Sequence, residues 1–249
     1  MFTAEIPDEL GKYYDFEDYI SHSNSNKGIF NKAYQVARKI NIGLKLKRIG
    51  DVKQNLVEIG SGTGNLLSAC QKKGWSVFGV EPNKTARENA LKLHNITLKN
   101  KLEEWAIEPQ SVDVIMLWHV FEHLEEPLKT LSTYQKLLKE NGKIVIAVPN
   151  NQSYDAHSYK EHWAAYDVPR HLNHFNKQSM RKLVEKAGME IASTKGMLLD
   201  AFYISMLSQK YKTGKSIALK GLSIGLWSNI RALMNDGEYS SLIFTIKTK

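Results

Sequence analysis

An acidic residue followed by three alternating glycines is the strongest chemical signal in this sequence. At residues 56–64 the letters L-V-E-I-G-S-G-T-G describe an apolar strand that contains Glu58 and continues through Gly60, Gly62 and Gly64. Glycine tolerates positive φ and lets a ligand come close to the backbone. Turns of this kind lie at the carboxyl edge of a parallel α/β sheet, where ligands bind. The stretch therefore predicts a site for a nucleotide-like ligand.

The spacing of the glycines and the position of the acid narrow the class of ligand. A dinucleotide-binding loop reads G-x-G-x-x-G, but here Asn65 occupies the place of its third glycine, which comes one residue early. Glu58 precedes the first glycine and would repel a pyrophosphate but not a cationic ligand. A second acid, Glu81, ends the next expected strand about twenty residues further on, where an acid accepts hydrogen bonds from ribose hydroxyls. The early third glycine and Glu58 disfavour a Rossmann-type dehydrogenase, which stays as an alternative.

The letters E-I-G-S-G-T-G resemble motif I of class I S-adenosylmethionine (SAM)-dependent methyltransferases, written D/E-x-G-x-G-x-G. The similarity covers roughly residues 55–191 and is closest to the broad bacterial group that includes the ubiquinone-type O-methyltransferases. It implies SAM as the cofactor, with side chains after the third and fourth strands beside it. The cofactor-binding residues expected from the turn, the second acid and this resemblance are Glu58, Gly60, Ser61, Gly62, Gly64, Glu81, Pro82, Leu102, Glu103, Trp118 and His119.

A histidine motif, H-x-x-E-H at residues 119–123, follows the fourth expected strand. On a helix, His119 and His123 would share one face, and the same letters occur in inverted zincin metalloproteases. Its place at a strand end opposite the glycine turn argues against a protease. The resembling O-methyltransferases carry E-x-x-E-H here, and some are thought to use a divalent metal, but a histidine in the first position suits Mg²⁺ less well. We expect no metal, and we expect Glu122 and His123 to cap and brace the helix beneath the cofactor.

A second histidine-rich stretch, from Asp167 to Phe175, resembles the D-x-P-x-H-x-x-H-F segment that helps to wall the substrate side in related bacterial methyltransferases. Histidine can act as a general base and arginine can clamp an anion. A packed loop whose histidines bond to the backbone is the alternative. The expected catalytic residues are His119, His171 and His174, and the expected substrate contacts are Tyr14, Tyr19, Trp163, Arg170 and His171.

The reaction implied by the resemblance is methyl transfer from the SAM sulfonium to an acceptor held in line with the breaking bond. Because a base matters most where the acceptor is a hydroxyl, we expect O-methylation of a small molecule. A macromolecular acceptor (RNA, protein or a lipid-linked glycan) and a non-catalytic SAM-binding protein are the alternatives. Methyltransferases of exocyclic nitrogens in nucleic acids usually carry an N-P-P-Y-like tetrapeptide after the fourth strand, where this sequence has L-W-H-V at residues 117–120.

Alternating strands and helices must position these groups, and that alternation favours a parallel sheet. The resemblance implies an α/β fold class: a Rossmann-like doubly wound seven-stranded sheet, mostly parallel, with an antiparallel last strand. We expect an N-terminal helical lid at 1–51 and a methyltransferase domain at 52–249, with a substrate-side segment at 150–176 and a helical insertion at 200–238. The expected strands are 56–59, 76–80, 96–98, 112–117, 143–148, 189–194 and 242–247, with a helix at 177–187.

Composition fits an ordinary soluble globular protein. The 249-residue chain has a net charge of +8 that is spread over every expected helix, so we expect a solvated surface rather than a nucleic-acid-binding face. Its single cysteine, Cys70, fits a reducing compartment. The sequence shows no signal-peptide pattern and no apolar run of bilayer length. We expect a cytoplasmic monomer or homodimer without a transmembrane segment, acting on a small-molecule substrate.

The expected insertion combines an apolar stripe with lysines. Large apolar residues recur between Ile217 and Leu233, and four lysines lie between Lys210 and Lys220. A stripe of this kind is typical of a lid or a dimer face, which is what we expect. A helix at a membrane surface is the alternative, although we do not expect peripheral membrane contact.

Overall fold

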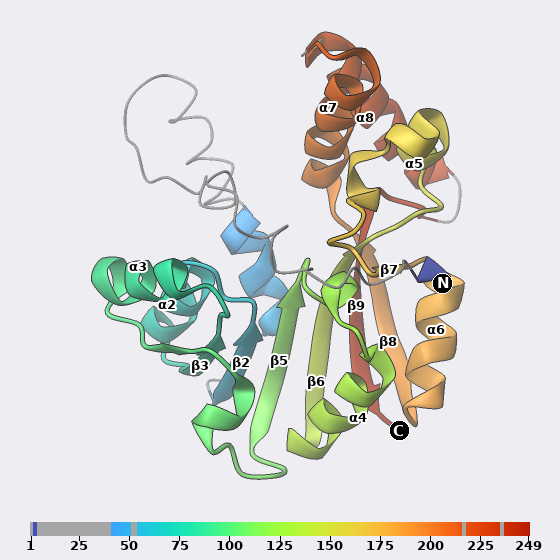
Figure 1. Cartoon of the computed structure of the whole chain (residues 1–249). Helices are drawn as coiled ribbons and strands as arrows, with labels where there is room; N and C mark the ends of the chain where they lie inside the picture. Colours follow the sequence, from blue (N-terminus) through green and yellow to red (C-terminus); the bar gives the residue numbers. More distant parts are fainter. Residues whose placement is uncertain (1, 4–40, 51–53, 216–217, 235–236) are drawn as a thin grey trace. The chain divides into compact units, whose positions relative to one another are not determined.

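The computed structural model describes residues 2–3, 41–50, 54–215, 218–234 and 237–249. Seven strands are hydrogen-bonded in the order β4-β3-β2-β5-β6-β9-β8, and β8 runs antiparallel to β9 (Figure 1). The expected α/β fold class, with a seven-stranded mixed sheet, is thereby confirmed. Residues 41–49 are helical, whereas Tyr14 and Tyr19 of the expected lid lie outside the described residues.

The elements follow the expected alternation from the glycine turn onward. The strands are β2 (Asn55–Ile59), β3 (Ser76–Val80), β4 (Leu98–Lys99), β5 (Val112–Trp118), β6 (Leu138–Pro149), β8 (Met189–Gly196) and β9 (Ser241–Thr248), with a separate ladder of β1 (Phe2–Thr3) and β7 (Asn173–His174). The α-helices are α2 (Asn65–Lys72), α3 (Lys84–His94), α4 (Pro127–Leu137), α5 (Tyr154–Tyr159), α6 (Lys177–Lys186), α7 (Leu198–Thr213) and α8 (Ala218–Met234). Short 3-10 turns are η3 (Leu102–Trp105), η4 (Phe121–His123), η5 (Lys160–His162) and η6 (Ala164–Tyr166).

The chain divides into two compact units. The glycine-turn unit comprises residues 14–117 and 134–145, and the histidine unit comprises residues 1–13, 118–133 and 146–249. Strand β6 and helix α4 contribute residues to both. The cofactor-binding residues expected up to Glu103 belong to the first unit, and all the expected histidines belong to the second.

In the glycine-turn unit, β2 pairs in parallel with β3 on one side and with β5 on the other. Leu56 and Val57 point to opposite faces of the strand and are both fully buried. A strand that is covered on both faces is apolar throughout. Helix α3 begins where the Asn83 side chain accepts a hydrogen bond from the N–H of Ala86 at 2.9 Å. The unit thus repeats a strand, a turn and a helix, and it presents the turns at one strand edge.

The strand expected at 96–98 begins later than expected because its first residues complete the preceding helix. Asn95 adopts the left-handed conformation at the end of α3, and the N–H of Ile96 donates to the carbonyl oxygen of Ala90 at 3.3 Å. Pairing with β3 therefore starts at Leu98, opposite Gly79. A Cβ atom at Gly79 would lie 2.2 Å from Leu98 Cδ2, so a glycine permits this close approach of β3 and β4.

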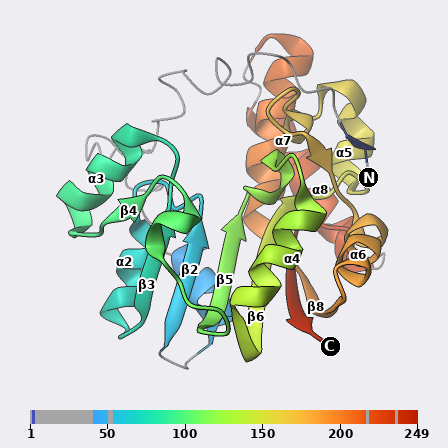
Figure 2. The ribbon, with the colours of Figure 1, turned by 60° about the horizontal axis from the view of Figure 1, so that its bottom comes forward.

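In the histidine unit, α7 and α8 form the expected helical insertion. They lie side by side, with α5 packed against both (Figures 1 and 2). The insertion is followed by β9, which pairs antiparallel with β8. The expected boundaries of 200–238 are close to those observed, because residues 198–234 include both helices.

A buried carboxylate ties these helices together. Asp155 on α5 accepts hydrogen bonds from the indole N–H of Trp163 at 2.7 Å, from Ser228 Oγ at 2.7 Å and from Ser240 Oγ at 2.6 Å. Trp163 is eight residues from Asp155 in the sequence, whereas Ser228 and Ser240 are 73 and 85 residues away. Buried carboxylates are tolerated when such donors satisfy them, so Asp155 fixes α5, α8 and the start of β9 to one another.

Candidate active site

The glycine turn has a left-handed backbone at each of its glycines. The φ angles of Gly60, Gly62 and Gly64 are 69°, 52° and 72°, a region that residues with a Cβ atom rarely adopt. The N–H groups of Gly60 and Ser61 donate to the carbonyl oxygen of Val80 at 2.8 and 3.0 Å. The turn is therefore fixed to the end of β3, and the expected need for glycine is confirmed.

Glu81 joins the glycine turn to the beginning of α3. Its Oε2 atom accepts a hydrogen bond from the N–H of Gly62 at 2.8 Å, and its Oε1 atom accepts one from the N–H of Asn83 at 2.9 Å. The carboxylate is buried. Each carboxylate oxygen can accept a second hydrogen bond. Glu81 can therefore hold the turn in place and still receive hydroxyl groups of a ligand.

Glu58 is a buried carboxylate with an unused oxygen. Its side chain lies in the interior just before the turn, and its Oε2 atom accepts no hydrogen bond from any described residue. Burial raises the pKa of Glu58 to about 8; Lys45 opposes this rise and Glu81 adds to it. A buried polar atom without a partner costs free energy. A cationic or hydrogen-bond-donating ligand group at this place would remove that cost.

The residues that follow β3 and β4 differ in their contacts and in how far they are buried. The indole N–H of Trp105 donates to the carbonyl oxygen of Gly79 at 2.8 Å, and its ring stands edge-on to Phe78 with centroids 5.3 Å apart. On the same 3-10 turn, Leu102 is half-buried and Glu103 is exposed, and Pro82 is also exposed. Trp105 was not among the expected residues, although an aromatic residue shortly after the third strand is a signal that sequence reasoning can use.

The histidine motif does not lie on a helix, contrary to the helical geometry that the sequence suggested. His119 follows β5 with a φ of 54°, and its N–H donates to the carbonyl oxygen of Ala147 at 3.0 Å. Only Phe121–His123 form a 3-10 turn, and α4 begins later, at Pro127. The helical arrangement in which His119 and His123 would share one face is therefore not present, because the left-handed residue makes a sharp turn after the strand.

Both ring nitrogens of His119 face carboxylates. Its Nε2 atom lies 3.0 Å from Asp200 Oδ2, its Nδ1 atom lies 3.5 Å from Glu122 Oε1, and 36% of its side chain is exposed. Burial disfavours the charged ring, but the hydrogen bonds and charges of Asp200 and Glu122 outweigh it and raise the pKa of His119 to about 10. A protonated imidazole has no free lone pair. At neutral pH His119 is therefore a cation, which removes the physical basis for its expected role as a base.

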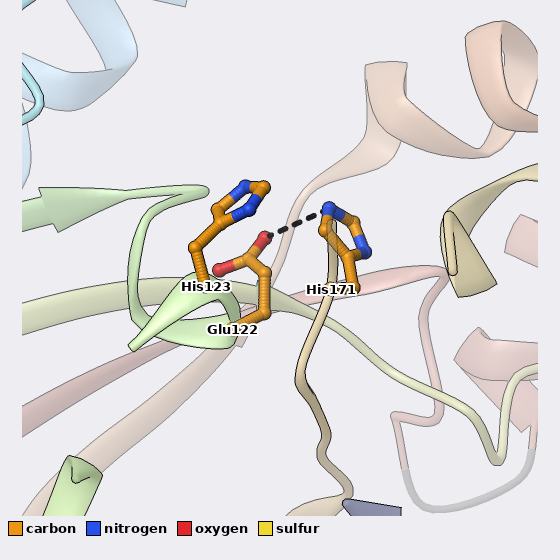
Figure 3. A group of neighbouring side chains, drawn as sticks. All are labelled: Glu122, His123 and His171. Carbon is orange, nitrogen blue, oxygen red and sulfur yellow. Dashed lines mark ion pairs between the residues drawn. The ribbon is translucent and has the colours of Figure 1, made fainter. Parts of the chain in front are cut away.

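Glu122, His123 and His171 form a group of neighbouring side chains (Figure 3). The Nδ1 atoms of His123 and His171 lie 2.9 Å from the carbonyl oxygens of Arg170 and Ala165. Because a carbonyl oxygen only accepts, each Nδ1 carries the proton, and Nε2 of the neutral ring keeps its lone pair. The Nε2 atom of His171 lies 4.0 Å from Glu122 Oε1. Burial lowers the pKa of His171, with Glu122 opposing the shift.

Glu122 is the negative centre of this group. Its side chain is 1% exposed. Burial acts to raise its pKa, but the hydrogen bond from His119 and the charges of the three histidines lower it. Glu122 and His123 thus brace the stretch that carries Arg170 and His171, rather than the helix that was expected. The ligand atoms of Glu122, His123 and His171 lie within 4.8 Å of one another, and imidazole with carboxylate suits transition metals. The absence of a metal stays a prediction.

The other expected substrate-side residues are held within their own segment. His174 Nε2 lies 2.8 Å from the carbonyl oxygen of Tyr166, and Arg170 Nη2 lies 2.7 Å from Asp167 Oδ1. Trp163 is buried, with its indole N–H on Asp155. Trp163, His171 and His174 border a space too narrow for a water molecule. Trp163 and His174 are therefore packed within their own segment, which agrees with the alternative of a packed loop. Their contact with a substrate stays a prediction.

Asp200, the carboxylate that faces His119, was also not among the expected residues. It lies in the first turn of α7, within the insertion. Nothing in the sequence near Asp200 connects it with a motif that follows a strand much earlier in the chain. Only the packing of α7 brings its carboxylate to His119.

A family model described as a methyltransferase domain matches residues 32–194. An uncharacterized methyltransferase of Bacillus pumilus is 32% identical over 147 residues, which are 57% of this chain and 65% of that protein. One of Alkaliphilus oremlandii is 35% identical over 116 residues, which are 45% of this chain and 52% of that protein. The chain thus spans less than two thirds of the length of these curated relatives.

Solved structures share the fold at low sequence identity. A SAM-dependent methyltransferase from Thermotoga maritima superposes with a TM-score of 0.61 at 16% identity, covering 96% of this chain and 99% of that chain. Phosphoethanolamine N-methyltransferase 2 of Haemonchus contortus, in complex with S-adenosyl-L-methionine, gives a TM-score of 0.57 at 22% identity and covers 84% of this chain and 52% of that chain. At sequence identities this low, the superpositions establish a common fold and nothing more specific.

Proposed function

This chain belongs to the methyltransferase-domain family, and from that membership we propose that it transfers the methyl group of SAM to a hydroxyl oxygen of a small molecule. The chemical class is that of a methyltransferase, and SAM is its cofactor. The proposal adds the kind of acceptor and the roles of individual residues. It rests on the glycine-turn unit for the cofactor and on the histidine unit for the acceptor.

The glycine-turn unit has the groups that SAM needs. When bound, SAM supplies an activated methyl group on a positively charged sulfur atom. We assign Glu58, with its unpartnered buried oxygen, to the positive end of the cofactor. We assign Glu81 to the ribose hydroxyls, since its oxygens can accept further hydrogen bonds while they hold Gly62 and Asn83. The other residues of this unit proposed to contact the cofactor are Gly60, Ser61, Gly64, Pro82, Leu102 and Glu103. Trp118 and His119, which belong to the histidine unit, are also proposed to contact it.

The tautomer of His171 is the observation that supports a hydroxyl group as the methyl acceptor. Its Nδ1–H is held by the Ala165 carbonyl, so its Nε2 lone pair is available for a proton. Burial lowers the pKa of His171, so the ring is neutral near pH 7. In the proposed reaction Nε2 of His171 takes the hydroxyl proton, and anionic Glu122 stabilises the imidazolium that forms. His119 then acts as a cation between the carboxylates of Glu122 and Asp200 and offsets one of their two negative charges, and His174 stays as a second candidate base.

The strand register places the end of β2 beside the end of β5 within the glycine-turn unit. Ile59 of β2 lies opposite Leu117 of β5, and Gly60 directly follows Ile59. The glycine turn therefore leaves the sheet at its carboxyl edge, which is where ligands bind in α/β proteins.

Transfer of labelled methyl groups from SAM to a fractionated bacterial extract tests the proposal. We expect label in the low-molecular-weight fraction, S-adenosylhomocysteine in equal amount, and a methyl ether in the labelled product by mass spectrometry. Label on nitrogen or carbon would contradict O-methylation. Label confined to RNA, protein or lipid-linked glycan would select a macromolecular acceptor. SAM binding without label in any fraction would indicate a non-catalytic SAM-binding protein.

A further inference from the structure

Helix α8 exposes apolar residues and buries small or polar ones. Its exposed large side chains are Leu219, Leu222, Leu226, Trp227, Leu233 and Met234. Its buried residues are Gly221, Gly225, Ser228, Asn229 and Ala232. A surface helix of a globular protein normally has the opposite arrangement. The exposed apolar set, called the α8 stripe below, therefore needs an explanation beyond the folding of this chain.

The buried face of α8 is committed to α7, so the α8 stripe cannot turn inward. A Cβ atom at Gly225 would lie 2.7 Å from the carbonyl oxygen of Ala201, and one at Gly221 would lie 2.6 Å from the Cα atom of Met206. The side chain of Asn229 also donates to the carbonyl oxygen of Leu198 at 2.9 Å. These contacts fix the rotation of α8 about its axis. They leave the stripe facing outward.

The surroundings of the α8 stripe are positively charged. Lys210, Lys212, Lys215 and Lys220 are exposed at the end of α7 and the beginning of α8. Residues 198–234 contain five basic residues and a single acidic residue, Asp200, which pairs with His119. A second copy of this chain that pairs through a parallel α8 helix would bring the same lysines towards one another, which charge opposes. A partner that offers an apolar layer beneath anionic groups complements both the apolar stripe and the lysines.

We propose that the α7–α8 hairpin docks this protein on the surface of a membrane that contains anionic phospholipid. Helix α8 would lie in the interface with its stripe among the acyl chains, while the lysines reach the headgroups. Among the described residues no helix is long and apolar enough to cross a bilayer, so the contact is with one face of the membrane. This inference goes beyond the proposed methyl transfer and does not depend on it.

Vesicle flotation of the full chain tests the docking surface, with and without anionic lipid. The key variant is the pair Leu222→Gln and Leu226→Gln, whose side chains are 40% and 52% exposed. The matched control is the pair Leu91→Gln and Leu93→Gln on α3, which are 53% and 45% exposed and lie outside the stripe. All four side chains are exposed, so circular dichroism should show that both variants stay folded. A third variant, Trp227→Phe, reports insertion through tryptophan fluorescence.

We expect binding to vesicles of phosphatidylcholine with phosphatidylglycerol at low salt, and little binding to phosphatidylcholine alone. The stripe variant should bind at least about tenfold more weakly, a change of about 1.4 kcal/mol, whereas the control variant should bind like the parent. The emission of the parent should shift to shorter wavelength with vesicles, and Trp227→Phe should lack most of that shift. Equal binding of parent and stripe variant, or no binding at low salt, would overturn the proposal. So would a dimer that the stripe variant dissociates in the absence of vesicle binding.

Discussion

The Nε2 atom of His119 lies 3.0 Å from the Oδ2 atom of Asp200, which links the turn after β5 to the first turn of α7. The other ring nitrogen of His119 faces Glu122. Carboxylates face both ring nitrogens and raise the pKa of His119 to about 10, so His119 acts as a fixed positive charge at neutral pH. The consequence is that the anionic Glu122 is neutralised on one side and remains available to His171 on the other.

Replacement of Asp200 by Asn should release the proton of His119. We expect the ring of His119 to stay protonated above pH 8 in the parent, because its pKa is about 10, and to titrate at clearly lower pH in Asp200→Asn. Ring-proton NMR measures both titrations, with exposed His157 on α5 as the internal control. An unchanged titration of His119 would show that Asp200 does not hold its charge.

The same pair should make stability depend on pH. The pKa of His119 is higher in the folded protein than its ordinary value of 6.5, so the pair contributes fully below pH 6.5 and loses its contribution as pH rises through about 10. The difference in unfolding free energy between the parent and Asp200→Asn should therefore shrink from pH 6 to pH 10. Urea unfolding measures this difference. A difference that grew with pH would contradict the assigned charge.

His171→Ala should lose methyl transfer to the acceptor while it keeps SAM binding. A general base contributes about 10²–10⁴-fold to rate, and we expect kcat to fall by that order with little change in the Kd of SAM. Because burial lowers the pKa of His171, the parent should keep its activity at neutral pH and lose it as the pH falls through that lowered pKa. His157→Ala is the control. A fully active His171→Ala would transfer the role to His174 or remove it.

Glu58→Gln should weaken SAM binding and remove part of its pH dependence. With a pKa of about 8, Glu58 in the ligand-free protein holds a proton at pH 7, and a cationic ligand should displace it. Calorimetry in buffers of different ionisation enthalpy should therefore show proton release with the parent and less with the variant. The cofactor's own amino group titrates alike in both experiments, so the difference isolates Glu58.

Glu58 should make the ligand-free protein less stable as pH rises. Because the pKa of Glu58 is raised by burial, the folded chain binds more protons than the unfolded chain between pH 4.5 and about 8. The parent should lose stability relative to Glu58→Gln as pH rises through that window. Urea unfolding measures the free energy of unfolding of both proteins. An equal difference between parent and Glu58→Gln at pH 5 and at pH 8 would show that Glu58 is not buried as described.

Gly225→Ala should destabilise the protein, whereas Gly43→Ala should not. A Cβ atom at Gly225 meets backbone atoms of α7, which cannot move aside, and overpacking of this kind costs about 1–3 kcal/mol. Gly43 lies in the helical residues 41–49 with open space around it, so alanine there should gain about 0.5–1 kcal/mol. Chemical denaturation of both variants checks the pair. Equal effects would contradict the close packing of α7 on α8.

The residues expected to bind the cofactor could be predicted from the sequence because they lie close together along the chain. The acid and three glycines at 58–64 sit on one strand and turn, and Glu81 ends the neighbouring strand, so their spacing alone indicates a shared edge. The positions of most strands followed from apolar runs between turns. The start of β4 did not, since Asn95 and Ile96 were needed to end α3.

The acceptor half depends on contacts between distant segments, and the sequence predicted less of it. The H-x-x-E-H spacing suggests a helix, but one left-handed residue, His119, replaces it with a turn. The partner of His119, Asp200, comes from the insertion, and no local pattern connects the two. Likewise the stripe on α8 was visible as periodicity, but only the packing of its glycines on α7 shows that the stripe faces outward.

Calorimetric titration of SAM into the parent, Glu81→Gln and Glu88→Gln tests whether SAM binds at the glycine turn. Glu81 holds the glycine turn and is proposed to bind ribose, whereas Glu88 is an exposed residue on the adjoining helix, within 3.9 Å of Lys84. We expect a Kd on the order of micromolar for the parent, at least about tenfold weaker binding for Glu81→Gln, and no change for Glu88→Gln. A parent that does not bind SAM, or a Glu81→Gln variant that binds it equally well, would show that the cofactor does not bind in this way.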